Sequence, residues 1–212
     1  MKTKLTTTQI TMLGLMVAVL LLMAYTPLGY LQVGPLAITF NMIPVAISAI
    51  VLGPLGGLIT GAVFGLTSFL QMMGIGGASA MGAMLFSINP FFAALLAFVP
   101  RILDGVLLGV IFRGVKKFTN AHVSCAVTGF CAAFLNTVFF MSALVGLFGN
   151  TEYLQGMMGG MNVLVFICTF VGINAVCEMI SSTVITAAVG AALSKAHVIQ
   201  GAAMDARKVV KA

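Results

Sequence analysis

Apolar residues follow one another in long runs along almost the whole chain, and polar residues interrupt them only briefly. Several runs approach the roughly 20 residues that an α-helix needs to cross the hydrocarbon core of a bilayer. Breaks rich in glycine and proline separate one run from the next. The pattern predicts an all-α membrane protein with six transmembrane helices, placed at residues 10–26, 38–52, 55–71, 90–112, 122–148 and 161–193.

Three segments differ from a simple crossing. The run at 38–52 is short for a full span, whereas 161–193 is longer than the membrane is thick, so we expect it to tilt or to project into the cytoplasm. The stretch 72–89 is rich in glycine, methionine and serine and is too broken to cross, which predicts an extracellular loop or a re-entrant segment. The whole chain, residues 1–212, is then one membrane domain with a cytoplasmic tail at 196–212.

The composition agrees with a membrane protein. Hydrophobic residues make up 61% of the chain and charged residues 7%, and the mean hydropathy is +1.18. Soluble globular domains carry about 25% charged residues. The net charge of +6 does not indicate nucleic acid, because the basic residues flank the apolar runs. The four cysteines lie inside apolar runs and lack metal-type spacing, so we expect them to be packing residues: Cys125, Cys131, Cys168 and Cys177.

The basic residues predict the orientation in the membrane. Six crossings put nine of the ten on one side, while the loops on the other side, 27–37, 72–89 and 149–160, hold a single charge, Glu152. Positive residues accumulate on the cytoplasmic side of membrane proteins, which places both termini inside. The nine are Lys2, Lys4, Arg113, Lys116, Lys117, Lys195, Arg207, Lys208 and Lys211.

Small residues recur at every fourth position in three of the predicted helices. Such a stripe lets another helix approach closely. For the helices at 55–71 and 90–112 we expect tight packing within the protein, whereas for the first helix a contact with another protein competes with internal packing. The stripes are Gly57, Gly61 and Gly65, then Gly105 and Gly109, and in the first helix Gly14 and Ala18.

Three ionisable residues lie inside the predicted spans: Arg101, Asp104 and Glu178. Charged groups in a bilayer are costly, so they are paired with one another or belong to a functional site. Arg101 and Asp104 are three residues apart and can share a helix face. Two alternatives stay open for Arg101, a structural bridge to Asp104 or Glu178 and a direct contact with a ligand.

Uncharged polar residues also fall inside or at the ends of the spans. Asn174 and Glu178 are four residues apart and therefore lie on one face of the last helix. A space between helices lined by such groups can hydrogen-bond a polar small molecule. The candidate substrate-binding residues are Thr39, Asn41, Arg101, Asn136, Asn174 and Glu178.

No catalytic constellation is visible in the sequence. The H-E-x-x-H, G-x-S-x-G and P-loop patterns are absent, so we expect neither an enzyme nor a chain that hydrolyses ATP itself. An intramembrane enzyme using Glu178 and Asp104 as an acid/base pair would still need a nucleophile or a metal. Any active transport must be energised by a partner or by an ion gradient. We expect no cofactor and no metal.

Several motifs carry a resemblance to a known family, and they occur in the family's order over residues 8–195. The chain resembles the substrate-binding S components of energy-coupling factor (ECF) transporters. The motifs are Thr26-Pro27-Leu28-Gly29, Gly34-Pro35, Ile43-Pro44-Val45, Leu52-Gly53-Pro54-Leu55-Gly56-Gly57, Gly61-Ala62-Val63-Phe64-Gly65-Leu66-Thr67-Ser68, Pro100-Arg101-Ile102-Leu103-Asp104-Gly105 and the segment from Asn174 to Glu178.

The resemblance implies a subunit in a bacterial plasma membrane that captures a vitamin and associates with a transmembrane T component and two ATPases. Gly14 and Ala18 match the helix-1 patch that touches the T component in this family. The loop 27–39 and the Ile-Pro-Val turn are most similar to pantothenate-type members, and Arg101 suits the carboxylate of pantothenate. Riboflavin, folate and thiamine stay open as substrates. Outside this family, the alternative is a self-sufficient proton-coupled carrier with Glu178 as its relay.

Overall fold

The computed structural model describes residues 7–26, 29–33, 36–77, 79–196 and 198, so nearly all of the predicted tail lies outside the described residues. The regular elements of the described residues are helices and one short hairpin. The elements are α1 (Thr7–Ala24), β1 (Tyr30–Val33), β2 (Leu36–Thr39), α2 (Met42–Leu52), α3 (Pro54–Met72), α4 (Ala80–Ile88), α5 (Pro90–Val115), α6 (Ala121–Phe148), α7 (Glu152–Met158) and α8 (Val163–Lys195).

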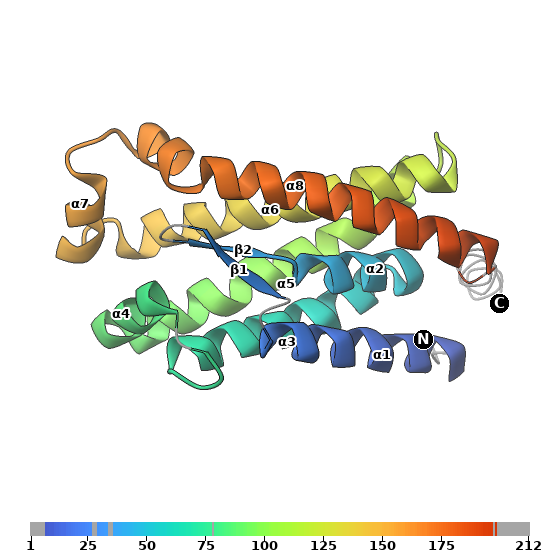
Figure 1. The fold of residues 1–212 in the computed structure, drawn as a ribbon, viewed down its shortest axis with the longest axis horizontal. Coiled ribbons are helices and arrows are strands. Elements are labelled where there is room, and N and C mark those ends of the chain that lie inside the picture. Colours follow the sequence, from blue (N-terminus) through green and yellow to red (C-terminus); the bar gives the residue numbers. More distant parts are fainter. Residues whose placement is uncertain (1–6, 27–28, 34–35, 78, 197, 199–212) are drawn as a thin grey trace.

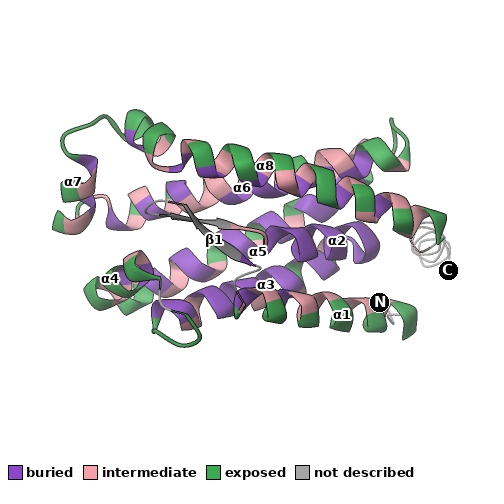
Figure 2. Cartoon of the chain, in the orientation of Figure 1, coloured by how far each residue is buried: buried purple, intermediate pink, exposed green. Residues whose placement is uncertain are grey.

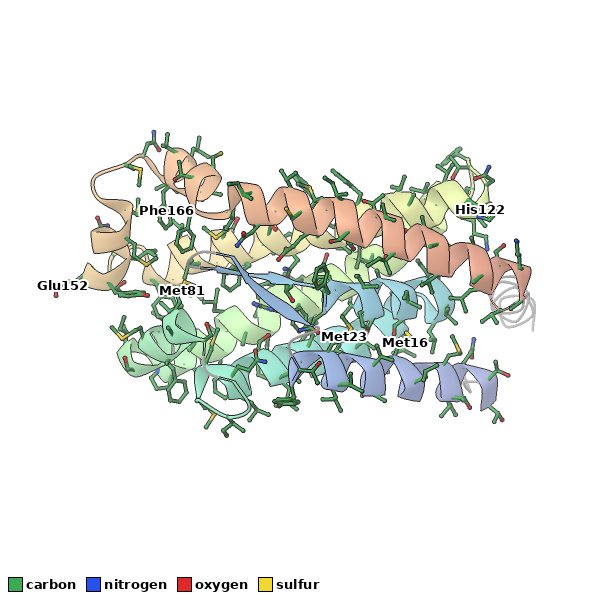
Figure 3. The ribbon with its side chains drawn as sticks, viewed as in Figure 1. Met16, Met23, Met81, His122, Glu152 and Phe166 are labelled. Atoms are coloured by element: carbon green, nitrogen blue, oxygen red, sulfur yellow. The ribbon has the colours of Figure 1, made fainter. Side chains whose placement is uncertain are left out.

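Five of the helices in the described residues are long and apolar enough to cross a membrane: α1, α3, α5, α6 and α8. They run lengthwise in one bundle, with α1 and α3 on one side of the hairpin and α6 and α8 on the other (Figure 1). The start of α1, the α5–α6 connection and the end of α8 share one end of the bundle, and α4 and α7 share the other. Figure 3 accordingly shows His122 and Glu152 at opposite ends.

The predicted second crossing is built from two different pieces. Strands β1 and β2 pair antiparallel, with Tyr30 opposite Thr39, and α2 then begins at Met42. The expectation that a helix runs from residue 38 is therefore wrong for residues 38–41. Pro44 explains the late start, because proline is tolerated in the first turn of a helix and disruptive further inside. With 11 residues, α2 rises only about 16 Å and is too short to span the membrane by itself.

Glycines bring α3 and α5 into close contact. A Cβ added to Gly57 would overlap the carbonyl oxygen of Gly105, and one added to Gly105 would overlap that of Gly57. Further along the same stripe, a Cβ on Gly61 would overlap the carbonyl oxygen of Arg101. The predicted tight packing within the protein is confirmed for these two helices, and it determines where the backbone of α5 lies at Arg101.

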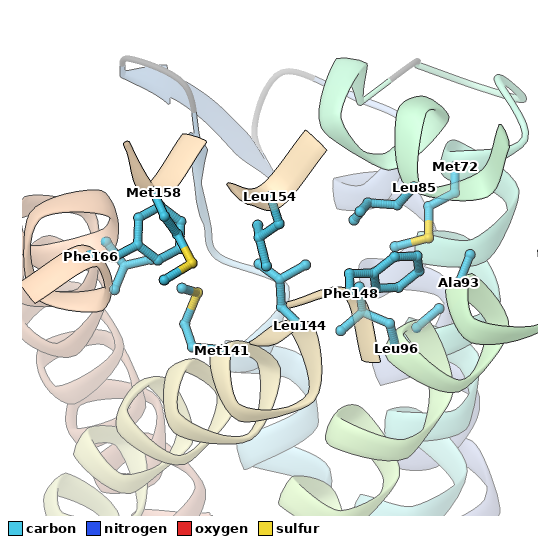
Figure 4. Packing of buried hydrophobic residues seen from close by; sticks show 12 residues of the cluster. Met72, Leu85, Ala93, Leu96, Met141, Leu144, Phe148, Leu154, Met158 and Phe166 are labelled. Atoms are coloured by element: carbon cyan, nitrogen blue, oxygen red, sulfur yellow. The ribbon is translucent and has the colours of Figure 1, made fainter. Parts of the chain in front are cut away.

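Two short helices cover one end of the bundle. The stretch 72–89 contains α4, and the connection after α6 contains α7, neither of which was expected from the sequence. Each begins with a capping hydroxyl: Ser79 accepts a hydrogen bond from the amide of Gly82, and Thr151 from that of Leu154. Apolar side chains of both helices pack against the ends of α3, α5, α6 and α8 (Figure 4). This end cluster includes Met72, Leu85, Leu96, Phe148, Leu154, Met158 and Phe166.

Burial divides the helices into a central one and peripheral ones (Figure 2). Every residue of α2 is buried, whereas in α1 only Leu20 and Ala24 are. Large apolar side chains are exposed along the outer faces of α1 and α8, including Leu22 and Ile173. A surface of this kind is unfavourable in water and favourable in lipid. The bundle is therefore an integral membrane domain with α2 at its centre.

Candidate functional site

A short hydrogen bond links the hairpin to α8. The backbone amide of Thr39, the last residue of β2, donates to Oε1 of Glu178 at 2.6 Å. Thr39 in turn accepts a bond of 3.4 Å at Oγ1 from the amide of Asn41. The amide of Phe40 donates to the carbonyl of Gly29 at 3.1 Å, which closes the base of the hairpin. Two of the predicted site residues, far apart in the sequence, are therefore in direct contact.

Asn41 lies where the hairpin passes into α2. Its side chain is fully buried, yet in the described part of the chain neither its Oδ1 nor its Nδ2 has a hydrogen-bond partner. It immediately precedes α2 but makes no side-chain cap. Most buried polar groups in proteins are hydrogen-bonded. An amide with two donors and an acceptor suits a polar ligand.

Arg101 lies on α5 between two aromatic rings. Its Cζ is 4.7 Å from the centroid of Phe140 on α6 and 5.4 Å from that of Phe64 on α3. Its Nη1 donates to the carbonyl of Leu96 at 2.7 Å. Cation–π contacts of this kind are worth more when the cation is desolvated, and Arg101 is buried. The guanidinium is therefore held in one orientation by three elements.

The remaining predicted residues come from α6 and α8. Asn136 is one helical turn from Phe140 and so faces the same region as Arg101. Its side chain is buried, and its Oδ1 has no hydrogen-bond partner among the described residues. Asn174 and Glu178 are also buried, one turn apart on α8. The structure thus joins Thr39, Asn41 and Glu178 through hydrogen bonds, and it buries Arg101, Asn136 and Asn174 within α5, α6 and α8.

Asp104 does not form the hydrogen-bonded bridge to Arg101 that was one alternative from the sequence. The carboxylate is fully buried, but within the described residues neither of its oxygens accepts a hydrogen bond. The carbonyl of Leu96 and the two rings, rather than Asp104, orient the guanidinium.

Sequence reasoning missed the groups that hold Arg101. Phe64 lies on another helix, and the Leu96 carbonyl is a backbone group without a sequence signature. One signal was present: Pro100 directly precedes Arg101 and lies inside α5, where it removes a backbone donor. The aromatic residue that contacts Arg101 most closely, Phe140, could be recognised as a candidate only by its depth in the membrane.

The predicted coupling pair lies on the outside of the bundle. Gly14 and Ala18 are both exposed on α1, and a Cβ added to Gly14 would meet no atom within 4 Å. The far end of α1 is by contrast tied to α3, because Nε2 of Gln71 donates to the carbonyl of Ala24 at 2.7 Å. The small-residue stripe of α1 therefore has no packing role inside the described part of this chain.

Known proteins of one family are similar in sequence to this chain. The sequence model of one family, "ECF transporter, substrate-specific component", matches residues 8–190. The chain belongs to this family. Two relatives are named as transporters of one vitamin. The pantothenate transporter PanT of Leuconostoc mesenteroides is 33% identical over 175 residues, 79% of this chain and 80% of the relative. The pantothenic acid transporter PanT of Lactococcus lactis is 28% identical over 179 residues, 77% of this chain and 81% of the relative.

Membership of the family decides the broad function. Substrate-specific components are subunits of transporters, so this protein is a multi-pass membrane transport protein and not an enzyme. Its substrate is a small molecule of the vitamin class.

Proposed function

We propose that this protein is the substrate-capture subunit of an ECF-type importer for pantothenate. The observation that carries the proposal is the burial of Asn41, Asn136 and Arg101 inside an apolar bundle, where amide atoms of the two asparagines have no hydrogen-bond partner within the described residues. The names of the two relatives point to the same vitamin. The site accordingly consists of Thr39, Asn41, Arg101, Asn136, Asn174 and Glu178.

The chemistry of pantothenate fits these residues. It has a carboxylate at one end, an amide in the middle and two hydroxyls at the other end. Arg101 pairs with the carboxylate, since a guanidinium binds a planar carboxylate through two parallel hydrogen bonds. Asn41, Asn136 and Asn174 supply donors and acceptors to the amide and the hydroxyls. Phe140 and Phe64 hold Arg101 and exclude water, which strengthens its attraction for an anion.

The sequence contains no nucleotide-binding motif, so transport driven by ATP requires partners. We infer an association with a transmembrane T component and two ATP-binding subunits in the plasma membrane of a bacterium. Gly14 and Ala18 form the coupling patch on α1, where a partner helix can approach closely. The chain makes six crossings, the second built from the hairpin together with α2, and both termini lie in the cytoplasm. The end of the bundle that carries α4 and α7 then faces the outside of the cell.

The first test is direct measurement of binding. Small molecules that co-purify with the detergent-solubilised protein are identified by mass spectrometry, and pantothenate, riboflavin, folate and thiamine are titrated by calorimetry. We expect pantothenate to bind and the three other vitamins not to bind. If another vitamin binds instead, that vitamin is the substrate and the proposal of pantothenate is wrong. If none of the four binds to a folded sample, the proposal of a vitamin-capture subunit is overturned.

A second test separates the two transport mechanisms. Uptake of labelled pantothenate is measured in cells with and without the T component and ATPases, and with and without a protonophore. We expect uptake to require the ATPases. Uptake by the chain alone that collapses with the protonophore would instead support the proton-coupled carrier with Glu178 as relay.

A further inference from the structure

Pro100 creates an unusual backbone group next to the site. It lies inside α5, ten residues after the first residue of that helix. Proline has no amide hydrogen, so the carbonyl four residues earlier, that of Leu96, lacks its ordinary helical donor. In a membrane such a group must be satisfied from within the protein.

Arg101 supplies the missing donor. Its Nη1 lies 2.7 Å from the carbonyl oxygen of Leu96, five residues earlier in the chain. The side chain therefore turns back along α5, and the guanidinium comes to lie between the rings of Phe64 and Phe140. The backbone of Arg101 is held as well, because α3 presses Gly61 against its carbonyl. Both ends of this long side chain are thus fixed.

We propose that Pro100 is a positioning residue for substrate binding: it frees the Leu96 carbonyl, which orients Arg101 toward the carboxylate of the ligand. The proposal rests on the function proposed above. A guanidinium that is ordered before binding loses less conformational entropy when the ligand arrives. A guanidinium carries five N–H donors in a planar fork, which lets one side chain bond to several acceptors at once. With an alanine at position 100, the backbone amide of that residue would donate to the carbonyl of Leu96. Arg101 would then lose this acceptor and its orientation.

The main experiment compares two proline substitutions in the same helix. Pro100→Ala restores the backbone donor, whereas Pro90→Ala changes an exposed proline at the first position of α5, where no donor is needed. Pantothenate affinity is measured by calorimetry on both purified proteins. We expect Pro100→Ala to bind about tenfold more weakly or worse, the range for a hydrogen bond to a charged group, and Pro90→Ala to bind as the wild type does.

A double-mutant cycle separates positioning from a general effect on α5. Arg101→Lys is combined with Pro100→Ala, and affinity is measured for all four proteins. If Pro100 acts through Arg101, the proline substitution has little further effect once the arginine is gone. Fully additive losses, or wild-type affinity in Pro100→Ala, would overturn the proposal.

A spectroscopic measurement tests the same contact without any ligand. The chain has three arginines, Arg101, Arg113 and Arg207, so protein labelled with ¹⁵N-arginine gives few guanidinium signals, and Arg101→Lys identifies one of them. We expect slow rotation and slow hydrogen exchange at the Arg101 Nη atoms in the wild type, and loss of both in Pro100→Ala. A freely rotating guanidinium in the wild type would refute the contact. If the contact is present but pantothenate does not bind, the proposed substrate fails and not the orientation of Arg101.

Discussion

The amide of Thr39 donates a hydrogen bond of 2.6 Å to Oε1 of Glu178, a residue 139 positions later in the chain. This bond joins the end of the hairpin to α8, the helix that carries two of the candidate binding residues. A carboxylate is a stronger acceptor for a backbone amide than a neutral group is. The hairpin therefore rests on α8 through a buried carboxyl group, so we expect a change at Glu178 to affect both the hairpin and the ligand.

Replacing Glu178 tests this attachment. In Glu178→Ala the amide of Thr39 loses its acceptor, so we expect its hydrogen exchange to accelerate and pantothenate binding to weaken by about 1.5–3 kcal/mol. Glu178→Gln keeps an oxygen acceptor without a carboxylate. Its hydrogen exchange and its pantothenate affinity should lie between those of Glu178→Ala and the wild type. Exchange is followed by mass spectrometry of peptides from the hairpin, with peptides from α3 as internal reference. An unchanged hairpin in Glu178→Ala would show that this bond does not hold it.

Asn41 offers a test that separates binding from stability. Its buried amide has no hydrogen-bond partner in the described part of the chain, so Asn41→Ala removes an unsatisfied group. We expect the thermal midpoint of the ligand-free protein to stay the same or to rise, while pantothenate affinity falls. Ser48→Ala is a suitable control, because Ser48 is a buried, unpartnered hydroxyl two turns further along α2. Equal loss of stability and binding in Asn41→Ala would assign this residue a structural role.

The contact between α3 and α5 can be tested at Gly61. A Cβ there would overlap the carbonyl of Arg101, so Gly61→Ala must displace α5 at the site. We expect a loss of about 1–3 kcal/mol in stability together with weaker binding, which thermal unfolding and calorimetry measure. Gly172→Ala is the matched control, since nothing lies within 4 Å of a Cβ at that position of α8. If Gly61→Ala binds pantothenate normally, the glycine stripe does not position Arg101.

The exposed stripe of α1 should affect transport and leave binding intact. Gly14→Leu and Ala18→Leu place bulk where we infer that a T component packs, so we expect uptake with the ATPase module to be lost. Both variants should still bind pantothenate in detergent, because neither position faces the site. Val110→Phe, at an exposed position on α5, is the control for added bulk. Normal uptake in both stripe variants would remove α1 from the coupling role.

Helix existence was largely predictable from sequence, and helix boundaries were predictable where glycine or proline marks them. Five predicted spans correspond to helices α1, α3, α5, α6 and α8, because long apolar runs have few alternatives in a membrane. The hairpin was missed because its strands are only four residues each and their pairing depends on the tertiary setting. The short helices α4 and α7 were missed because runs of nine and seven residues carry little periodic signal.

The sequence by itself determined that this protein lies in a membrane, which polar residues lie within it, and which helices have faces smooth enough to touch. These properties follow from composition and spacing, since burying a polar group in lipid is costly wherever it occurs along the chain. Only the tertiary structure decided which polar groups meet. It joined Thr39 to Glu178 and turned Arg101 toward Leu96 and Phe140 instead of bonding it to Asp104. Such pairings depend on the relative rotation and depth of separate helices, and that is a property of their packing.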